Sequence, residues 1–188
     1  IGIFTACIVF PVSILLDGSL TKIERDRIFV IYIIAFFVIF FWAAYEQAGA
    51  SLTLFAAEQT DRTILGWEMP ASWIQSFNPF FVVILAAIMP SVWGALNKRG
   101  MEPASPTKQA IGLLLLSLGY LVICFGVKDV QPGVKVSLIW LTGLYFIHTM
   151  GEIALSPIGL SMVNKLTPVR FASLMMGIWY LSTSTANK

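Results

Sequence analysis

Long runs of apolar residues, separated by short polar segments, dominate the sequence. From Ile28 to Ala44 no charged residue occurs, and apolar side chains would cover every side of a helix formed by this stretch. A helix of about 26 residues rises about 39 Å, enough to cross the roughly 30 Å hydrocarbon layer of a bilayer. A soluble domain's helix would show a polar face over such a length. The pattern therefore predicts one unbroken membrane-spanning helix from Ile28 to Thr53.

Further apolar runs follow, and the fold class expected is all-α, a polytopic membrane helical bundle. The predicted spans cover about 28–55, 73–96, 109–127, 136–163 and 171–186. The run 1–16 is short for a complete span, and a mixed-charge segment joins it to the first span. Both ends of the sequence adjoin apolar runs, which indicates a piece of a longer protein whose last span here is truncated.

Composition supports a membrane protein and excludes some partners. Hydrophobic residues make up 57% of the 188-residue chain and charged residues 12%, about half the usual charged share of roughly 25% in globular domains. The net charge of only +2 gives no indication of a nucleic-acid-binding surface. In the predicted topology, eight Lys and Arg residues flank the spans on one side and three on the other. The positive-inside rule makes the first side cytoplasmic.

Two carboxylates, Glu46 and Glu152, interrupt the predicted spans. A charged side chain at that depth costs roughly 2.5–3.5 kcal/mol on insertion scales, so each needs a partner or a water-filled cavity. No Lys or Arg of the sequence lies at matching depth. We expect both carboxylates to be functional, and either protonated, paired with a Lys or Arg outside this chain, or both. A carboxylate that loses a nearby cation can take up a proton. Alternating access coupled to protons requires such a group.

Other polar side chains extend the same pattern. His148, Glu152 and Ser156 recur every four residues, which would stack an imidazole, a carboxylate and a hydroxyl on one helix face. His148 is then either a proton relay or an interhelical hydrogen bonder. Asn78, directly before Pro79, either contacts a ligand or repairs a kinked backbone. Tyr45 and Trp179 can each be a pocket residue or a packing residue.

Three sequence motifs resemble those of a known protein family. Phe41–Gln47 (FWAAYEQ), Gln75–Pro79 (QSFNP) and Gly151–Ser161 (GEIALSPIGLS) resemble those of the proton-dependent oligopeptide transporters of the major facilitator superfamily. The resemblance implies the C-terminal six-helix half of a major facilitator fold, in part. Residues 1–27 would be the end of an inserted hairpin helix and a cytoplasmic linker, and 28–188 the C-terminal bundle. The absent N-terminal half would supply an arginine and a lysine.

The resemblance also implies residue roles. Glu46 matches a glutamate that pairs with the first-helix arginine in proton coupling. Glu152 matches a glutamate that faces the peptide amino terminus, pairs with the fourth-helix lysine and shares in proton coupling. Asn78 matches an asparagine that hydrogen-bonds the peptide backbone.

Three further positions complete the implied site. Trp179 matches a tryptophan beside the substrate side-chain pockets, and Tyr45 occupies a position that is acidic in some members. Glu58 matches an acid of the extracellular gate, with Asp61 as the alternative. His148 matches no family role, so its role as a relay depends on spacing alone.

The expected function is proton-coupled symport of di- and tripeptides across the bacterial inner membrane by the full-length protein. The fragment alone would be an inactive half-bundle, needing lipid and the N-terminal half, with protons as coupling ion and no other cofactor. Alternative substrates are nitrate, an amino-acid conjugate or a peptide-like drug. An intramembrane enzyme using His148 and Glu152 is disfavoured, because no nucleophile paired with a base and no metal-ligand cluster occurs at matching depth.

Overall fold

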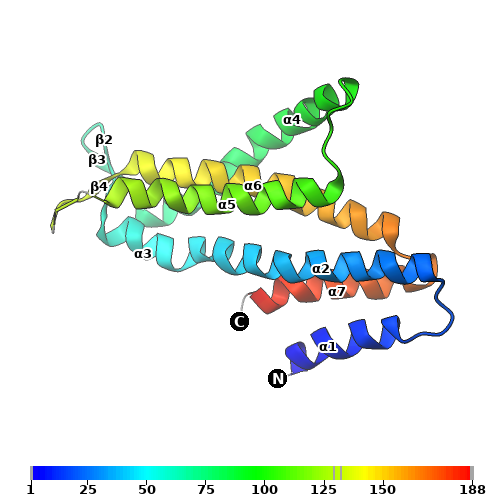
Figure 1. Ribbon diagram of the computed structural model, residues 1–188. Helices are drawn as coiled ribbons and strands as arrows, with labels where there is room; N and C mark the ends of the chain where they lie inside the picture. Colours follow the sequence, from blue (N-terminus) through cyan, green and yellow to red (C-terminus); the bar gives the residue numbers. More distant parts are fainter. Residues whose placement is uncertain (1, 129, 132, 187–188) are drawn as a thin grey trace. The chain divides into compact units, whose positions relative to one another are not determined.

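A computed structural model of the chain describes residues 2–128, 130–131 and 133–186 (Figure 1). The helices are α1 (Gly2–Leu15), α2 (Lys22–Tyr45), α3 (Ser51–Glu58), α4 (Phe77–Lys98), α5 (Ser105–Val127), α6 (Leu138–Leu166) and α7 (Ala172–Ala186). Short 3-10 turns are η1 (Glu46–Gly49), η2 (Ala71–Ser76) and η3 (Val169–Phe171). Two-residue strands are β1 (Thr60–Asp61), β2 (Thr63–Ile64), β3 (Trp67–Glu68) and β4 (Val136–Ser137).

Four helical segments are long and apolar enough to cross a membrane. They are Lys22–Glu58, Ala71–Lys98, Ser105–Val127 and Leu138–Leu166. These segments overlap the first four predicted spans, with boundaries that differ by a few residues, and the span boundaries stay predictions. The predicted fifth span corresponds to α7, preceded by η3. The helical bundle predicted from the apolar runs is therefore present, with only two-residue strands added to it.

The first span is not the unbroken helix that the sequence predicted. Helix α2 ends at Tyr45, η1 follows, and α3 starts at Ser51 after Ala50 leaves helical geometry at φ −119° and ψ −92°. The Thr53 hydroxyl donates to the Ala48 carbonyl at 2.8 Å, which satisfies a carbonyl released by the break. Hydroxyl side chains commonly compensate such breaks in membrane helices. Glu46 and Thr53 therefore lie in two separate helical segments, η1 and α3.

The described residues form two compact units, which we treat separately. The terminal unit comprises residues 1–44 and 156–188, and the central unit comprises Tyr45–Leu155. In the terminal unit, α1 packs against α7. Arg170 in η3 donates to the Ser19 hydroxyl at 2.7 Å and the Ser19 carbonyl at 2.9 Å, which ties the α1–α2 linker to the turn before α7. The predicted domain boundary at residue 27 stays a prediction.

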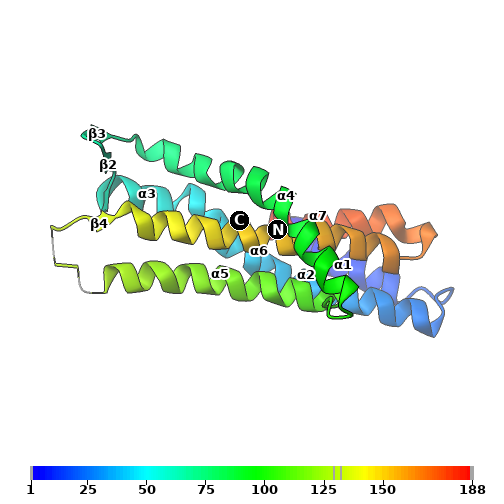
Figure 2. The ribbon, with the colours of Figure 1, turned by 90° about the horizontal axis from the view of Figure 1, so that it is seen from above.

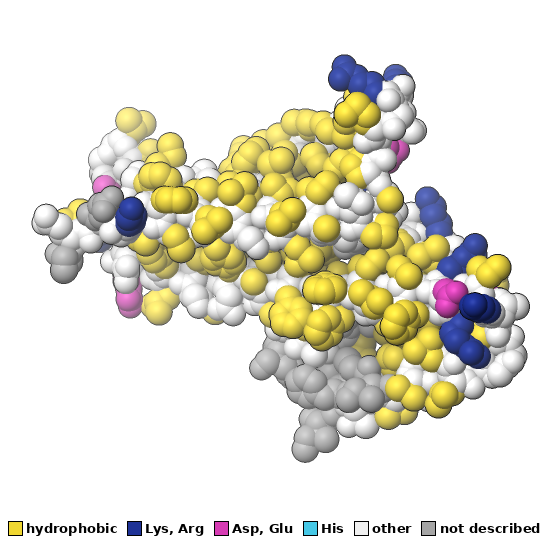
Figure 3. Space-filling model, viewed as in Figure 1, with side chains coloured by type: hydrophobic (Ala, Val, Ile, Leu, Met, Phe, Trp, Pro, Cys, Tyr) yellow, Lys and Arg dark blue, Asp and Glu magenta, His cyan; other side chains and the backbone are white. Residues whose placement is uncertain are grey.

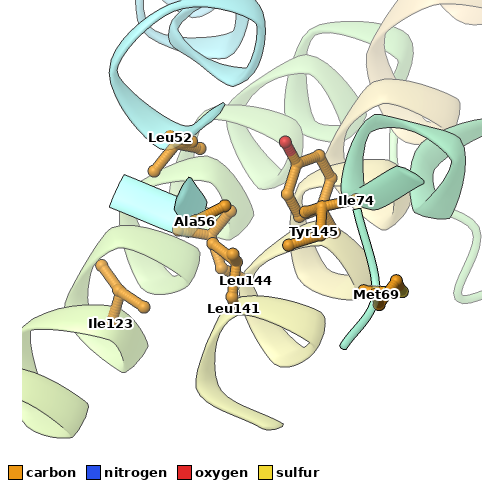
Figure 4. Packing of buried hydrophobic residues seen from close by; sticks show 8 residues of the cluster. All are labelled: Leu52, Ala56, Met69, Ile74, Ile123, Leu141, Leu144 and Tyr145. Carbon is orange, nitrogen blue, oxygen red and sulfur yellow. The ribbon is translucent and has the colours of Figure 1, made fainter. Parts of the chain in front are cut away.

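The central unit has a hydrophobic core where α3, η2, α5 and α6 meet (Figure 4). Ile74, Leu141 and Leu144 are fully buried, and Tyr145 packs beside them with 3% of its surface exposed. The remaining members of the cluster are Leu52, Ala56, Met69 and Ile123. This packing holds the first turns of α6 in place, and the polar residues of α6 follow directly after it.

Helices α5 and α6 lie side by side in both ribbon views (Figures 1 and 2). A Cβ added to Gly112 would lie 2.9 Å from the carbonyl oxygen of Gly151, and a Cβ on Gly151 would lie 2.9 Å from that of Gly112. A Cβ on Gly119 would collide with the His148 ring. Small residues permit this approach of backbones in membrane helices. Gly112, Gly119 and Gly151 therefore allow α5 and α6 to pack closely.

The outward faces of the helices are apolar. On α5, Leu114, Leu118, Leu121 and Phe125 are each 47–69% exposed and recur at helical spacing. In the space-filling view, hydrophobic side chains cover the sides of the helices, whereas Lys and Arg gather at helix ends (Figure 3). A surface of this kind suits a lipid environment, because water would penalise so large an apolar area.

Candidate functional site

A hydrogen-bonded network in the central unit has the Glu152 carboxylate at its centre. The Tyr45 hydroxyl donates to Glu152 Oε2 at 2.5 Å, and Asn78 Nδ2 donates to the same oxygen at 3.0 Å. Asn78 Nδ2 also donates to the Tyr45 hydroxyl oxygen and, at 3.2 Å, to Thr149 Oγ1. Three of the residues predicted for substrate binding, Tyr45, Asn78 and Glu152, are therefore brought into direct contact.

Three separate helices position these side chains. Tyr45 is the last residue of α2, Asn78 lies in the first turn of α4, and Thr149 and Glu152 are one turn apart on α6. Pro79 lies in the first turn of α4, directly after η2, and a proline is tolerated in the first turn of a helix. Because the Asn78 amide bonds side chains of other helices, it does not serve the backbone repair considered from the sequence.

Glu152 is half-buried and lacks a basic partner within the described residues. Its Oε2 atom accepts both hydrogen bonds, whereas Oε1 accepts none from this part of the chain. A carboxylate oxygen without a donor can accept one, and a cationic donor forms the stronger hydrogen bond. The arrangement can therefore bind an ammonium group at Oε1.

Glu46 does not join the network. It is the first residue of η1, directly after Tyr45, and its side chain is exposed. Its pairing with an arginine of the N-terminal half and its part in proton coupling therefore stay predictions. Glu46 shares no ion pair with a Lys or Arg among the described residues.

His148 lies between α5 and α6. Its ring is 3% exposed, and Nε2 lies 3.1 Å from the carbonyl oxygen of Leu116, so Nε2 carries the proton of this bond. The ring packs against Tyr120, with centroids 4.8 Å apart, and Gly119 leaves the space for it. The interhelical hydrogen bond considered from the sequence is present, and a relay role stays a prediction.

The side chains of His148, Glu152 and Ser156, predicted to stack on one helix face, do not form hydrogen bonds with one another. His148 bonds α5 and Glu152 bonds Tyr45 and Asn78, while the buried Ser156 hydroxyl finds no partner among the described residues. Steps of four residues advance slightly more than one full turn, so the three side chains reach different neighbours.

The two candidates for the outer gate lie close together in sequence but in different settings. Glu58 ends α3 and lines an open hollow of about 410 Å³ that Lys135 also lines. Asp61, in β1, is fully exposed, and hydrogen bonds from the Thr63 backbone and side chain hold the pKa of the Asp61 carboxyl below its usual range. The Thr63 amide lies 3.0 Å from Asp61 Oδ1. The ionised Asp61 is thus hydrogen-bonded to its neighbour Thr63, whereas Glu58 lines the open hollow.

Trp179 belongs to α7 in the terminal unit. Only 4% of its surface is exposed among the described residues. This burial agrees with the packing interpretation raised from the sequence, and its place beside a substrate pocket stays a prediction.

Sequence reasoning missed Thr149 and Gln109. Thr149 is fully buried and contacts Asn78, and Gln109 Nε2 donates to the Leu155 carbonyl at 2.9 Å across α5 and α6. The signal for Thr149 was present, because a residue three positions before Glu152 shares its helix face. A spacing of four residues, the one used in the sequence analysis, pairs Glu152 with His148 and passes over Thr149.

Membrane-length helices that carry an internal polar network centred on one carboxylate are typical of a polytopic membrane protein. The chain belongs to the POT family, whose sequence pattern it matches over residues 5–188. The family resemblance and the major facilitator fold expected from the motifs are confirmed.

Relatives and solved structures agree with this assignment. The chain is 37% identical over 172 residues to peptide transporter YePEPT of Yersinia enterocolitica, covering 90% of this chain and 34% of that protein. It is 34% identical to dipeptide and tripeptide permease A of Escherichia coli K12, covering 87% of this chain and 32% of the permease. It is similar to a crystal structure of a mutant peptide transporter POT in complex with alafosfalin, with TM-score 0.85, 34% identity and coverage of 98% of this chain and 38% of that one. The chain thus spans about a third of the length of these curated relatives.

Proposed function

We propose that this chain is part of a transporter that moves di- and tripeptides together with protons across the bacterial inner membrane by alternating access. The observation that carries the proposal is the half-buried Glu152 carboxylate, held at Oε2 by the Tyr45 hydroxyl and the Asn78 amide. Relatives that carry the names peptide transporter and dipeptide and tripeptide permease support the substrate class.

In this proposal Glu152 binds the ammonium group of the peptide through Oε1. A charge-assisted hydrogen bond is stronger than a neutral one, and the partly buried setting reduces competition from water. Tyr45 and Asn78 hold the carboxylate in one rotamer, so little conformational entropy is lost when the peptide binds. A lysine from the N-terminal half would pair with Glu152 when no peptide is present, as the resemblance implies.

The other predicted residues keep their proposed roles. Glu46 exchanges an arginine partner of the N-terminal half for a proton, and its exposure on this chain leaves it accessible to such a partner. Glu58 acts at the extracellular gate, where its hollow is open. Trp179 contributes to the pocket wall, and His148 is a candidate relay. The protein needs protons as coupling ion and no other cofactor, and it is not an enzyme.

The test uses the full-length transporter in proteoliposomes with an alkaline interior. We expect a labelled dipeptide to accumulate against its gradient, and an ionophore that dissipates the proton gradient should abolish this accumulation. Competition by unlabelled di- and tripeptides, but not by nitrate or free amino acids, would define the substrate class. Uptake that is unaffected by the ionophore, or inhibited by nitrate and not by peptides, would contradict the proposal.

Replacement of Glu46 tests proton coupling separately from substrate binding. Glu46→Gln in the full-length transporter should reduce proton-driven accumulation to simple equilibration, because a neutral amide cannot carry the proton. Counterflow, in which unlabelled peptide inside exchanges for labelled peptide outside, should persist within about a factor of two to three of wild type, since its exchange needs no net proton transfer. Accumulation at the wild-type level would refute the coupling role, and Asp26→Asn, at an exposed carboxylate with no proposed role, serves as the control variant in the same assay.

A further inference from the structure

Thr149 is a fully buried hydroxyl inside the polar network, and no role has been assigned to it. Its Oγ1 atom donates to the Tyr145 carbonyl, one turn earlier on α6, at 2.7 Å, and lies 3.2 Å from Asn78 Nδ2. A hydroxyl has one proton to donate. Because that proton goes to Tyr145, only the lone pairs of Thr149 face Asn78.

The Tyr45 hydroxyl is in the same situation. It donates its proton to Glu152 Oε2 at 2.5 Å, so toward Asn78 it can only accept. Three acceptor oxygens therefore surround the NH₂ group of Asn78: those of Tyr45, Thr149 and Glu152. The two hydroxyls donate their protons to other groups, and the carboxylate oxygen carries no proton. The carbonyl oxygen Oδ1 of Asn78 accepts no hydrogen bond from the described residues.

This pattern fixes which end of the Asn78 amide meets the ligand. With the NH₂ group held, Oδ1 is the end available to a ligand, and an amide oxygen only accepts. If the amide turned by 180°, Oδ1 would lie against the Thr149 lone pairs, and the NH₂ group would lose its acceptors. An unpaired buried polar group costs roughly 1–3 kcal/mol, so the observed orientation is preferred.

We propose that Thr149 is a positioning residue that keeps the Asn78 amide in this orientation throughout the transport cycle, so that Oδ1 receives an N–H group of the peptide. This inference rests on the proposed function. Glu152 cannot do this alone, because an acidic proton on Oε2 could donate to Oδ1 and favour the turned amide. The proton of Thr149 goes to a helix carbonyl and is independent of both proton and peptide binding.

The test is Thr149→Val in the full-length transporter, since valine keeps the shape and removes the hydroxyl. One hydrogen bond contributes about 0.5–1.5 kcal/mol, which corresponds to a rise in KM of about two- to tenfold. We expect the maximal uptake rate to stay within about a factor of two of wild type. Thr149→Ser should restore the KM, because it returns the hydroxyl.

Thr142 provides a matched control on the same helix. Its hydroxyl also donates four residues back, to the Leu138 carbonyl at 3.0 Å, but it has no contact with Asn78. Thr142→Val should therefore leave the KM at the wild-type value. A similar rise in both valine variants would mean that loss of the helix bond alone matters, and would overturn the proposal.

A double-mutant cycle shows whether Thr149 acts through Asn78. In the Asn78→Ala background, Thr149→Val should add no further rise in KM, because the amide to be positioned is gone. An equal rise in both backgrounds, or a wild-type KM for Thr149→Val alone, would overturn the positioning role while the proposed function stands. A wild-type transporter without proton-driven peptide uptake would overturn the function and this role together.

Discussion

Glu152→Gln in the full-length transporter is expected to lower proton-driven dipeptide uptake by about a hundredfold or more. The substitution removes the charge that would hold the peptide ammonium group, and a hydrogen bond to a charged group contributes roughly 1.5–3 kcal/mol. The amide oxygen of glutamine can keep the hydrogen bonds from Tyr45 and Asn78, and its NH₂ group then takes the Oε1 position, where a donor would face the donating ammonium group of the peptide. Each 1.4 kcal/mol of lost binding free energy lowers the affinity tenfold, so the two effects together account for a decrease of about a hundredfold in uptake.

The measurement is initial uptake of a labelled dipeptide in proteoliposomes, with binding of the same peptide measured by calorimetry. Asp26→Asn is the matched control, because Asp26 is an exposed carboxylate near the start of α2 and has no proposed role in transport. Weak uptake together with weak binding would support a role at the substrate. Wild-type affinity in Glu152→Gln would contradict contact with the ammonium group, even if uptake were lost.

A smaller change at Tyr45 distinguishes charge from positioning. Tyr45→Phe keeps the ring and removes only the hydroxyl that donates to Glu152 at 2.5 Å. We expect peptide affinity to fall by about three- to tenfold, the usual contribution of one hydrogen bond to a buried partner. The check is the KM for the same dipeptide, and a loss as large as that of Glu152→Gln would contradict the separation of roles.

The sequence was most informative where periodicity is strong. Uncharged runs of more than 17 residues have few alternatives to a spanning helix, so the spans starting near Ile28, Trp73 and Gln109 were predictable to within a few residues. The break after Tyr45 was not, because a 3-10 turn of four residues leaves the apolar pattern almost unchanged. It depends instead on the backbone at Ala50, which composition does not reveal.

The candidate site was predictable residue by residue but not as a network. Glu152 and Asn78 were identifiable because polar groups are costly in lipid and because the motifs carry them. Their direct contact, and the part played by Thr149, required the relative placement of α4 and α6 within the central unit. Glu46 is exposed and Trp179 is buried within the terminal unit, and the roles that the motifs imply for them stay predictions.

The same change, glycine to alanine, is expected to have opposite effects at two positions of the central unit. A Cβ at Gly112 would lie 2.9 Å from the Gly151 carbonyl oxygen and 3.1 Å from Leu155 Cβ, whereas a Cβ at Gly94 meets nothing within 4 Å. Gly112→Ala forces two packed backbones apart, and overpacking of this kind costs about 1–3 kcal/mol. Gly94→Ala in α4 should be neutral or stabilise by up to about 1 kcal/mol, since alanine favours helix over glycine.

Thermal unfolding of the full-length transporter in detergent measures both effects. We expect Gly112→Ala to lower the Tm by several degrees and Gly94→Ala to leave it unchanged or raise it slightly. Gly151→Ala should match Gly112→Ala, because its Cβ would lie 2.9 Å from the Gly112 carbonyl oxygen. If Gly112→Ala and Gly94→Ala shifted the Tm alike, the close contact of α5 and α6 would not be a source of stability. If Gly112→Ala lowers the Tm and Gly94→Ala does not, the close packing of α5 against α6 stabilises the helix that carries Thr149 and Glu152.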